Sequence, residues 1–157
     1  MKSLLALLLL LASTEIRAAD FSKGVGVGMI VGEPTGISLK WFLDLRSSVV
    51  FGGSYSWNQF VTLHADYLWH FDHFVSKNRF LARMRPYIGA GVAEVFSTIT
   101  RTAAFGSTGF GARVPVGLAW IYDTAPFEAF VEVAPGFIFT PQSYFFVQGG
   151  IGARILF

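Results

Sequence analysis

The chain has 157 residues, of which 53% are hydrophobic and 14% are charged, and it contains no cysteine. This length predicts one domain, and the high apolar and low charged content excludes intrinsic disorder. The lack of cysteine excludes disulfides, iron–sulfur clusters, thiolate zinc sites and a lipidated N-terminal cysteine. The formal net charge is +2 without any basic tract, so nucleic acid is not an expected partner. The 17 Phe and 17 Gly favour strands and turns over helices.

The N-terminal segment, residues 1–18, is predicted to be a secretory signal peptide. Lys2 precedes an unbroken apolar run, Leu4 to Ala12, which is too short to span a bilayer as a helix. Such a run fits the core of a signal peptide, and cleavage is expected after the small residue Ala18. A short buried helix is the alternative interpretation. The expected mature domain is residues 19–157, outside the cytoplasm.

Apolar and other residues alternate along most of the remaining chain, which is typical of strands with two different faces. The alternating segments have about nine to eleven residues, the length of a tilted strand that crosses a bilayer. Both chain ends then lie on one side, because the number of segments is even. The predicted fold is an all-β, eight-stranded, antiparallel up-and-down transmembrane β-barrel. The segments are 25–31, 37–45, 49–57, 61–71, 85–95, 113–122, 127–134 and 145–157, with a polar connection at 72–83 and a loop at Ser97–Gly111.

Alternation alone does not say which face is inside, since a soluble barrel or sandwich would bury the apolar face. Two features favour a membrane barrel, in which the apolar face meets lipid. The second face consists mainly of Gly, Ser and Ala with single charges, which suits the crowded interior of an eight-stranded barrel. The apolar face places its large aromatics near strand ends, as interfacial girdles do: Trp57, Trp69, Phe71, Trp120, Tyr122, Phe139 and Phe157.

Three prolines lie within or beside these segments. Proline lacks the backbone N–H that strand pairing uses, and a closed barrel has no edge strand where this N–H would be unnecessary. Pro86 is expected to begin its strand, and Pro135 is expected near the far rim. Pro115 is expected to mark a bulge or a late strand start.

Several stretches resemble a widespread family of uncharacterised bacterial outer-membrane β-barrels. They are GEPTGISLK (32–40), LHADYLWHF (63–71), PYIGAG (86–91), RVPVGLAW (113–120), PFEAFVEVAP (126–135) and GGIGARILF (149–157). The resemblance covers nearly all of the mature chain and implies a small barrel similar to the OmpA/OmpX type, with no catalytic residues. The terminal Phe157, with apolar residues at alternate positions before it, resembles the C-terminal signal that the barrel-assembly machinery reads.

The period-two pattern assigns equal numbers of positive and negative side chains to the barrel interior, as a low-dielectric environment requires. We expect Arg154 to be held by Glu128, Glu132 or both. The competing interpretation is that these groups are solvated at the rim, where an ion pair contributes only about 0–1 kcal/mol. The predicted network comprises Lys40, Asp44, Asp66, Arg85, Arg113, Glu128, Glu132 and Arg154.

Other constellations are weaker candidates for a site. His64, Asp66 and His70 share one strand face beside Ser54 and Ser56, as a hydrolase would require, but a structural polar network is favoured because no nucleophile motif accompanies them. The two histidines are roughly 20 Å apart at strand rise, too far to share a metal ion. The glycine clusters at 24–28 and 149–152 precede no helix, so they do not predict phosphate binding.

The expected function is therefore that of a small, monomeric, non-enzymatic outer-membrane barrel with a structural or surface-interaction role. Its expected partners are outer-membrane lipid and the assembly machinery, and no cofactor or metal is expected. An open channel is not expected, since eight strands leave no aqueous bore. The Ser97–Gly111 loop is the one long enough for recognition. Two alternatives stay open: a barrel enzyme that modifies lipid or peptide, and a soluble periplasmic barrel that binds an apolar ligand.

Overall fold

The structure is a computed structural model that describes residues 24–74, 81–97, 108–122 and 125–157. The predicted signal peptide (1–18) and most of the Ser97–Gly111 loop lie outside the described residues. The strands are β1 (Val25–Glu33), β2 (Thr35–Phe42), β3 (Ser47–Ser56), β4 (Phe60–His70), β5 (Met84–Ser97), β6 (Thr108–Arg113), β7 (Val116–Ile121), β8 (Phe127–Thr140) and β9 (Tyr144–Leu156), and a 3₁₀ turn, η1 (Leu81–Arg83), precedes β5.

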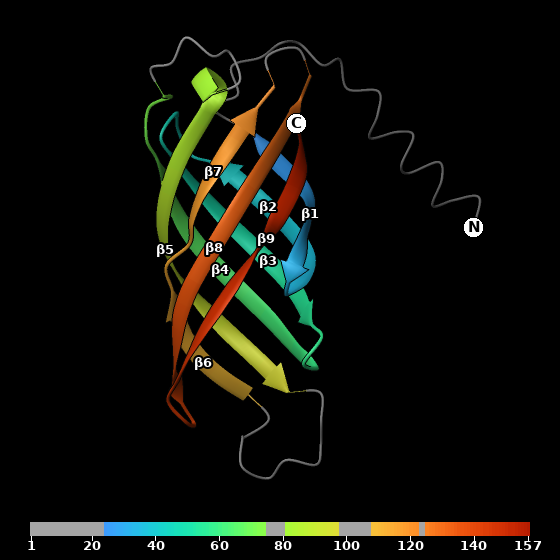
Figure 1. Cartoon of the computed structure of the whole chain (residues 1–157), viewed down its shortest axis with the longest axis vertical. Helices are drawn as coiled ribbons and strands as arrows, with labels where there is room; N and C mark the ends of the chain where they lie inside the picture. Colours follow the sequence, from blue (N-terminus) through green and yellow to red (C-terminus); the bar gives the residue numbers. More distant parts are fainter. Residues whose placement is uncertain (1–23, 75–80, 98–107, 123–124) are drawn as a thin grey trace, which may run out of the picture.

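The strands form one closed antiparallel ring (Figure 1). Each strand from β1 to β5 pairs with the next one, and β8 pairs with β9. The ring closes where β1 pairs with β9, from Gly26 opposite Leu156 to Glu33 opposite Gly149. Among the described residues, no helix is long and apolar enough to cross a membrane.

Strands β6 and β7 are two halves of one span. Both pair with β5 on one side and with β8 on the other. The register does not change between the halves, since Arg113 lies opposite Gly136 and Val116 opposite Val133. The ring therefore has eight spans, and the predicted eight-stranded antiparallel up-and-down barrel is confirmed.

Pro115 interrupts this span: β6 ends at Arg113 and β7 starts at Val116, so of the two expected alternatives the late strand start is observed, without a bulge at the proline. Pro115 is fully buried and lies in register with Gly89, whose N–H donates to the Pro115 carbonyl at 2.7 Å. The register shift in this span lies instead at Phe110/Gly111. The alternation of inner and outer side chains therefore continues through the proline.

Pro135 lies inside β8 rather than near the far rim, so its predicted position is wrong. Strand β8 continues to Thr140, because residues 135–140 keep the alternation that the proline obscures in the sequence. The Pro135 carbonyl accepts the Val114 N–H at 2.9 Å. The N–H and C=O of a strand residue point to the same side, so the donor that Pro135 lacks would face the break between β6 and β7.

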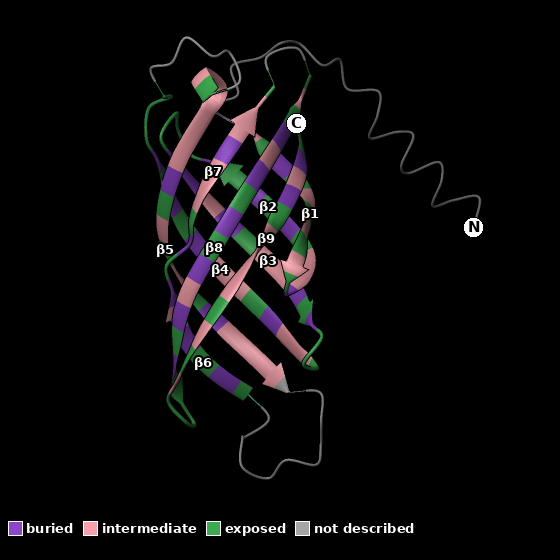
Figure 2. Ribbon diagram, viewed as in Figure 1, coloured by how far each residue is buried: buried purple, intermediate pink, exposed green. Residues whose placement is uncertain are grey.

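The two ends of the barrel differ in what they carry. Gly24 and Phe157 lie at one end, here called the termini end, with the turn at 43–46, residues 71–74, η1 and residues 125–126 (Figure 1). The opposite end, here called the far end, carries the turns at Pro34, 57–59 and 141–143. Along the strands, buried residues alternate with exposed ones (Figure 2), as period two requires.

Candidate functional site

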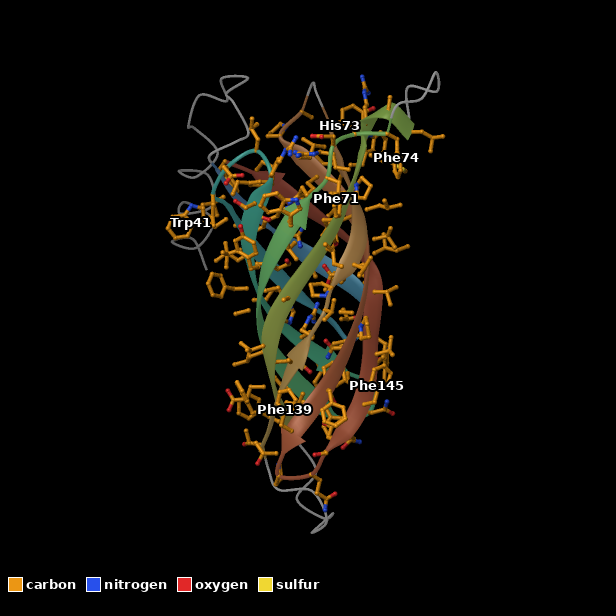
Figure 3. The ribbon with its side chains drawn as sticks, turned by 90° about the vertical axis from the view of Figure 1, so that its left-hand side faces the viewer. Trp41, Phe71, His73, Phe74, Phe139 and Phe145 are labelled. Carbon is orange, nitrogen blue, oxygen red and sulfur yellow. The ribbon has the colours of Figure 1, made fainter. Side chains whose placement is uncertain are left out.

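The outer face of the barrel is apolar along every span. Exposed aliphatic residues cover its middle, and aromatic residues gather toward its ends: Figure 3 shows Trp41, Phe71 and Phe74 near the termini end, and Phe139 and Phe145 near the far end. Within the described strands, Glu94 is a charged residue on this face, and it pairs with Leu63 and Phe110. Glu33, the last residue of β1, lies at the far rim, where its carboxylate accepts the Ser56 hydroxyl. Of the predicted girdle, Trp57, Trp69, Phe71, Tyr122, Phe139 and Phe157 are exposed, and Trp120 is partly buried against Tyr122.

The barrel interior nearer the termini end holds a three-membered ion cluster. Glu128 accepts from Lys40 Nζ at 2.5 Å and from Arg154 Nη1 at 2.8 Å. The Arg154 guanidinium also donates twice to Ser38 Oγ, at 3.0 and 2.9 Å, and lies 3.7 Å from the centre of the Phe130 ring. Lys40 and Glu128 are completely buried. One buried carboxylate therefore contacts two buried cations.

His70 belongs to the same cluster as a hydrogen-bond acceptor. Its Nε2 lies 3.0 Å from Lys40 Nζ. Because an ammonium group can only donate, His70 Nε2 must be the acceptor and its ring proton must lie on Nδ1. The Lys40 ammonium also lies 4.5 Å from the centre of the Phe42 ring, which adds a cation–π contact.

A second ion cluster lies deeper toward the far end and is centred on Arg113. Its guanidinium donates to Glu132 at 2.6 Å and to Gln148 Oε1 at 2.7 Å, and its Nε lies 3.2 Å from Asp66 Oδ1. Tyr87 donates to the second Glu132 oxygen at 2.9 Å. Both carboxylates and the guanidinium are buried, so each charge has an opposite charge within reach.

Six of the eight residues of the predicted charge network lie in these two clusters. The six carry three positive and three negative charges, so the interior is formally balanced. Arg154 is bonded to Glu128, whereas Glu132 is bonded to Arg113. The six are Lys40, Asp66, Arg113, Glu128, Glu132 and Arg154.

Asp44 does not belong to the interior network, contrary to the prediction. It lies in the exposed turn after β2, where it accepts the Arg46 and Ser47 N–H groups at 2.6 and 2.8 Å and the Ser47 hydroxyl at 2.5 Å. These bonds, the Ser47 hydroxyl foremost, hold the pKa of Asp44 below its ordinary value. The period-two rule fails here because the strand ends at Phe42.

Arg85 lies at the rim of the termini end and also stands apart from both clusters. Its guanidinium donates to the carbonyl oxygens of Leu45, at 2.6 Å, and Phe71, at 3.4 Å. It therefore ties two neighbouring connections to β5 instead of neutralising a buried carboxylate.

The Ser–His–Asp constellation is not assembled for nucleophilic catalysis. Ser54 donates to the Thr62 carbonyl, and Ser56 donates to Glu33. His64 Nε2 lies 3.7 Å from Asp66 Oδ2, and its ring lies against Gly52, where a Cβ would come within 2.2 Å of it. A triad needs a serine hydroxyl bonded to the histidine, and these serines donate elsewhere. Among the described residues, no group of three or more His, Asp and Glu side chains is arranged to hold a metal ion.

The far end contains a cavity of about 400 Å³ that sequence reasoning missed. Its walls include the rings of Phe60, Tyr144 and Phe146, and its floor includes Thr62 and Gln148, whose side chains are 3.3 Å apart. Tyr144 and Phe146 share the inner-face parity of Gln148 on β9, which is the signal that could have indicated large side chains at this mouth. A separate space of about 20 Å³ beneath it, beside His64 and Arg113, has room for about one water molecule.

Two solved structures have the same fold as this chain. The N-terminal β-barrel domain of Pseudomonas aeruginosa OprF is 17% identical with a TM-score of 0.66, over 87% of this chain and 98% of that one. The Neisserial surface protein A, NspA, is 16% identical with a TM-score of 0.51, over 85% of this chain and 94% of that one. The fold is that of a small outer-membrane barrel.

The sequence matches no protein-family model and no curated protein. The two solved structures confirm the resemblance to small barrels of the OmpA type in the architecture. Because their sequence identities are low, the similarity concerns the fold alone.

Proposed function

We propose that this protein resides in the bacterial outer membrane as a non-enzymatic β-barrel with a structural or surface-interaction role. The distribution of polarity carries this proposal. Apolar side chains with aromatic bands cover the outside, whereas six charges, three of each sign, lie inside in two ion clusters. Exposing so much apolar surface to water would be unfavourable, and a lipid environment removes that cost.

The proposed lipid partner follows from the same surface. Aromatic side chains are enriched where a bilayer meets water, and here they flank a zone of aliphatic residues such as Val27, Leu39 and Ile151. The resemblance of the two solved outer-membrane barrels supports this location. A soluble barrel with an apolar ligand is disfavoured, because its apolar face would have to be the inner one.

The proposed contact with the barrel-assembly machinery concerns the last strand. Val25 and Phe157 exchange backbone hydrogen bonds, with N–O distances of 2.8 and 3.2 Å, at the seam where β1 meets β9. The C-terminal residue thus takes part in closing the ring. We expect removal of Phe157 to lower the amount of assembled barrel in cells while leaving secretion across the inner membrane unchanged.

The four tryptophans provide the test of membrane location, because all of them lie on the outer face. Trp41 and Trp69 lie toward the termini end with Trp120, and Trp57, which is 83% exposed, lies at the far end. In liposomes, lipids brominated near the headgroups should quench this fluorescence more strongly than lipids brominated near the bilayer centre. Efficient quenching by aqueous iodide with no effect of brominated lipid would contradict the proposal.

Electrophoresis provides an independent test of the closed barrel. A ring in which every strand is paired resists detergent, so unheated and boiled samples should migrate differently. Fractionation of cells should recover the protein with the outer membrane. A soluble periplasmic product without a heat-dependent shift would overturn the proposal.

A further inference from the structure

The barrel wall is incomplete beside β9 at the far end. The ladder between β1 and β9 stops at Glu33 opposite Gly149, whereas β9 pairs with β8 as far as Tyr144 opposite Ile138. Residues 145–148 of β9 therefore pair with β8 on one side and lie beyond the end of the β1 ladder on the other side. Figure 1 shows the β8–β9 hairpin extending well beyond the end of β1.

The 400 Å³ cavity lies behind this gap. Glu33 and Pro34 of the β1–β2 turn line one side of it, and Tyr144 and Phe146 of β9 line another. Its size is within the range of small-molecule sites, which are mostly apolar with a few polar groups. Three aromatic rings, with Phe60 as the third, supply the apolar surface, and the paired Thr62 and Gln148 supply hydrogen-bonding groups.

The charge at this mouth is negative. Glu33 is the one carboxylate among the described lining residues, and none of these residues is a Lys, Arg or His. Its carboxylate is held by the Ser56 hydroxyl and by the Trp57 N–H, at 3.4 Å for the latter. A carboxylate accepts more hydrogen bonds than these two. Below the floor, the charge of Arg113 is compensated by Glu132 and Asp66, so it does not cancel the field of Glu33.

We propose that the far mouth binds a small cationic amphiphile, with its ammonium group at Glu33 and its apolar part against the rings of Phe60, Tyr144 and Phe146. An aromatic wall next to a carboxylate is complementary to an ammonium group, because both attract positive charge. The inference rests on the barrel fold and not on the location of the protein.

Three probes with the same alkyl chain test the charge preference: octyltrimethylammonium, octyl glucoside and octanoate. The barrel is reconstituted in phosphatidylcholine nanodiscs, and amide resonances of Thr62, Phe146 and Gln148 are followed by NMR during titration. Octyltrimethylammonium should give saturable shifts at these positions and bind about tenfold more tightly than octanoate, from one ion pair and cation–π contacts. Equal affinities for the two ions would overturn the proposal.

Two variants test the position of the ligand. Glu33→Gln should remove the preference for the ammonium probe while octyl glucoside binding is retained. Val95→Trp should abolish binding of all three probes, since Val95 lies on the inner face opposite Thr62 and lines the cavity. The matched control is Val92→Trp on the outer face of the same strand, which should leave binding unchanged.

A heat-dependent shift on a detergent gel establishes that each variant is folded before its titration is interpreted. Unchanged binding to folded Val95→Trp would overturn the proposal. So would shifts that never saturate and that spread evenly over outward-facing amides, because they would indicate partition into the bilayer. Neither result would affect the tests of membrane location, which use tryptophan quenching.

Discussion

Glu128 and Arg154 lie directly opposite each other in the β8–β9 ladder, and their side chains meet inside the barrel with Nη1 2.8 Å from Oε2. The backbone register therefore sets the ion pair, because both residues point inward at the same level. Lys40 approaches the other oxygen of Glu128 from β2, across the interior. The Arg154–Glu128 pair thus links the neighbouring strands β9 and β8. Lys40 links Glu128 to β2, three strands further around the ring.

Replacing Arg154 by alanine should destabilise the barrel strongly. The variant removes one of the two cations on buried Glu128 and leaves Ser38 without its guanidinium partner. Loss of one partner of a buried ion pair costs about 3–5 kcal/mol. Urea unfolding in liposomes measures this loss, with Ile155→Ala, on the outer face, as the control. A midpoint equal to that of the wild type would show that the interior pair contributes nothing to stability.

Replacing Glu128 by glutamine should destabilise the barrel more than replacing Glu132 by glutamine. Glu128 is the carboxylate that both Lys40 and Arg154 contact, so its loss leaves two buried cations without an anion. Without Glu132, Arg113 still has Asp66 at 3.2 Å. The cost for Glu128→Gln should be about 3–5 kcal/mol. The same unfolding assay compares the two variants, and the reverse order would contradict this account of the clusters.

The pairing of Glu128 with Arg154 could be predicted from the sequence. The alternation indicates that both side chains point inward, and the hairpin that joins their strands places them at the same height in the barrel. The same rule misplaced Asp44, since parity loses its meaning where a strand bends into a connection. Arg85 has the inward parity of its ladder partner Ala119, but its long side chain reaches carbonyl oxygens at the rim. The full length of β8 was not predicted because of Pro135. This residue lacks a backbone N–H, and a missing N–H in the interior of a sheet normally argues against a strand. The far cavity depends on how far β9 extends past β1, a relation between distant segments that no local pattern encodes.

The turn between β2 and β3 should show a carboxylate with a lowered pKa. Asp44 accepts the Ser47 hydroxyl and two backbone N–H groups, all of which favour the charged form. A lowered pKa means that this turn is stabilised above the pKa of the unfolded chain and loses that contribution as the pH falls through the folded value. NMR titration of the Asp44 carboxyl should find its pKa below the ordinary value, and Ser47→Ala should raise it. An unchanged pKa in Ser47→Ala would exclude the hydroxyl as the main cause.

Gly89 should tolerate no side chain, in contrast to Gly53. A Cβ at Gly89 would lie 2.5 Å from the Tyr67 carbonyl oxygen and 3.0 Å from Cγ of Pro115. Backbone and a proline ring cannot move aside easily, so Gly89→Ala should lose about 1–3 kcal/mol through overpacking. Gly53 is the matched control, because the nearest contact of its Cβ would be the flexible end of Leu63 at 3.4 Å. Urea midpoints of the two variants, measured in the same liposomes, should differ accordingly. If both variants unfold together, the close approach of β5 to Pro115 does not limit the packing of this wall.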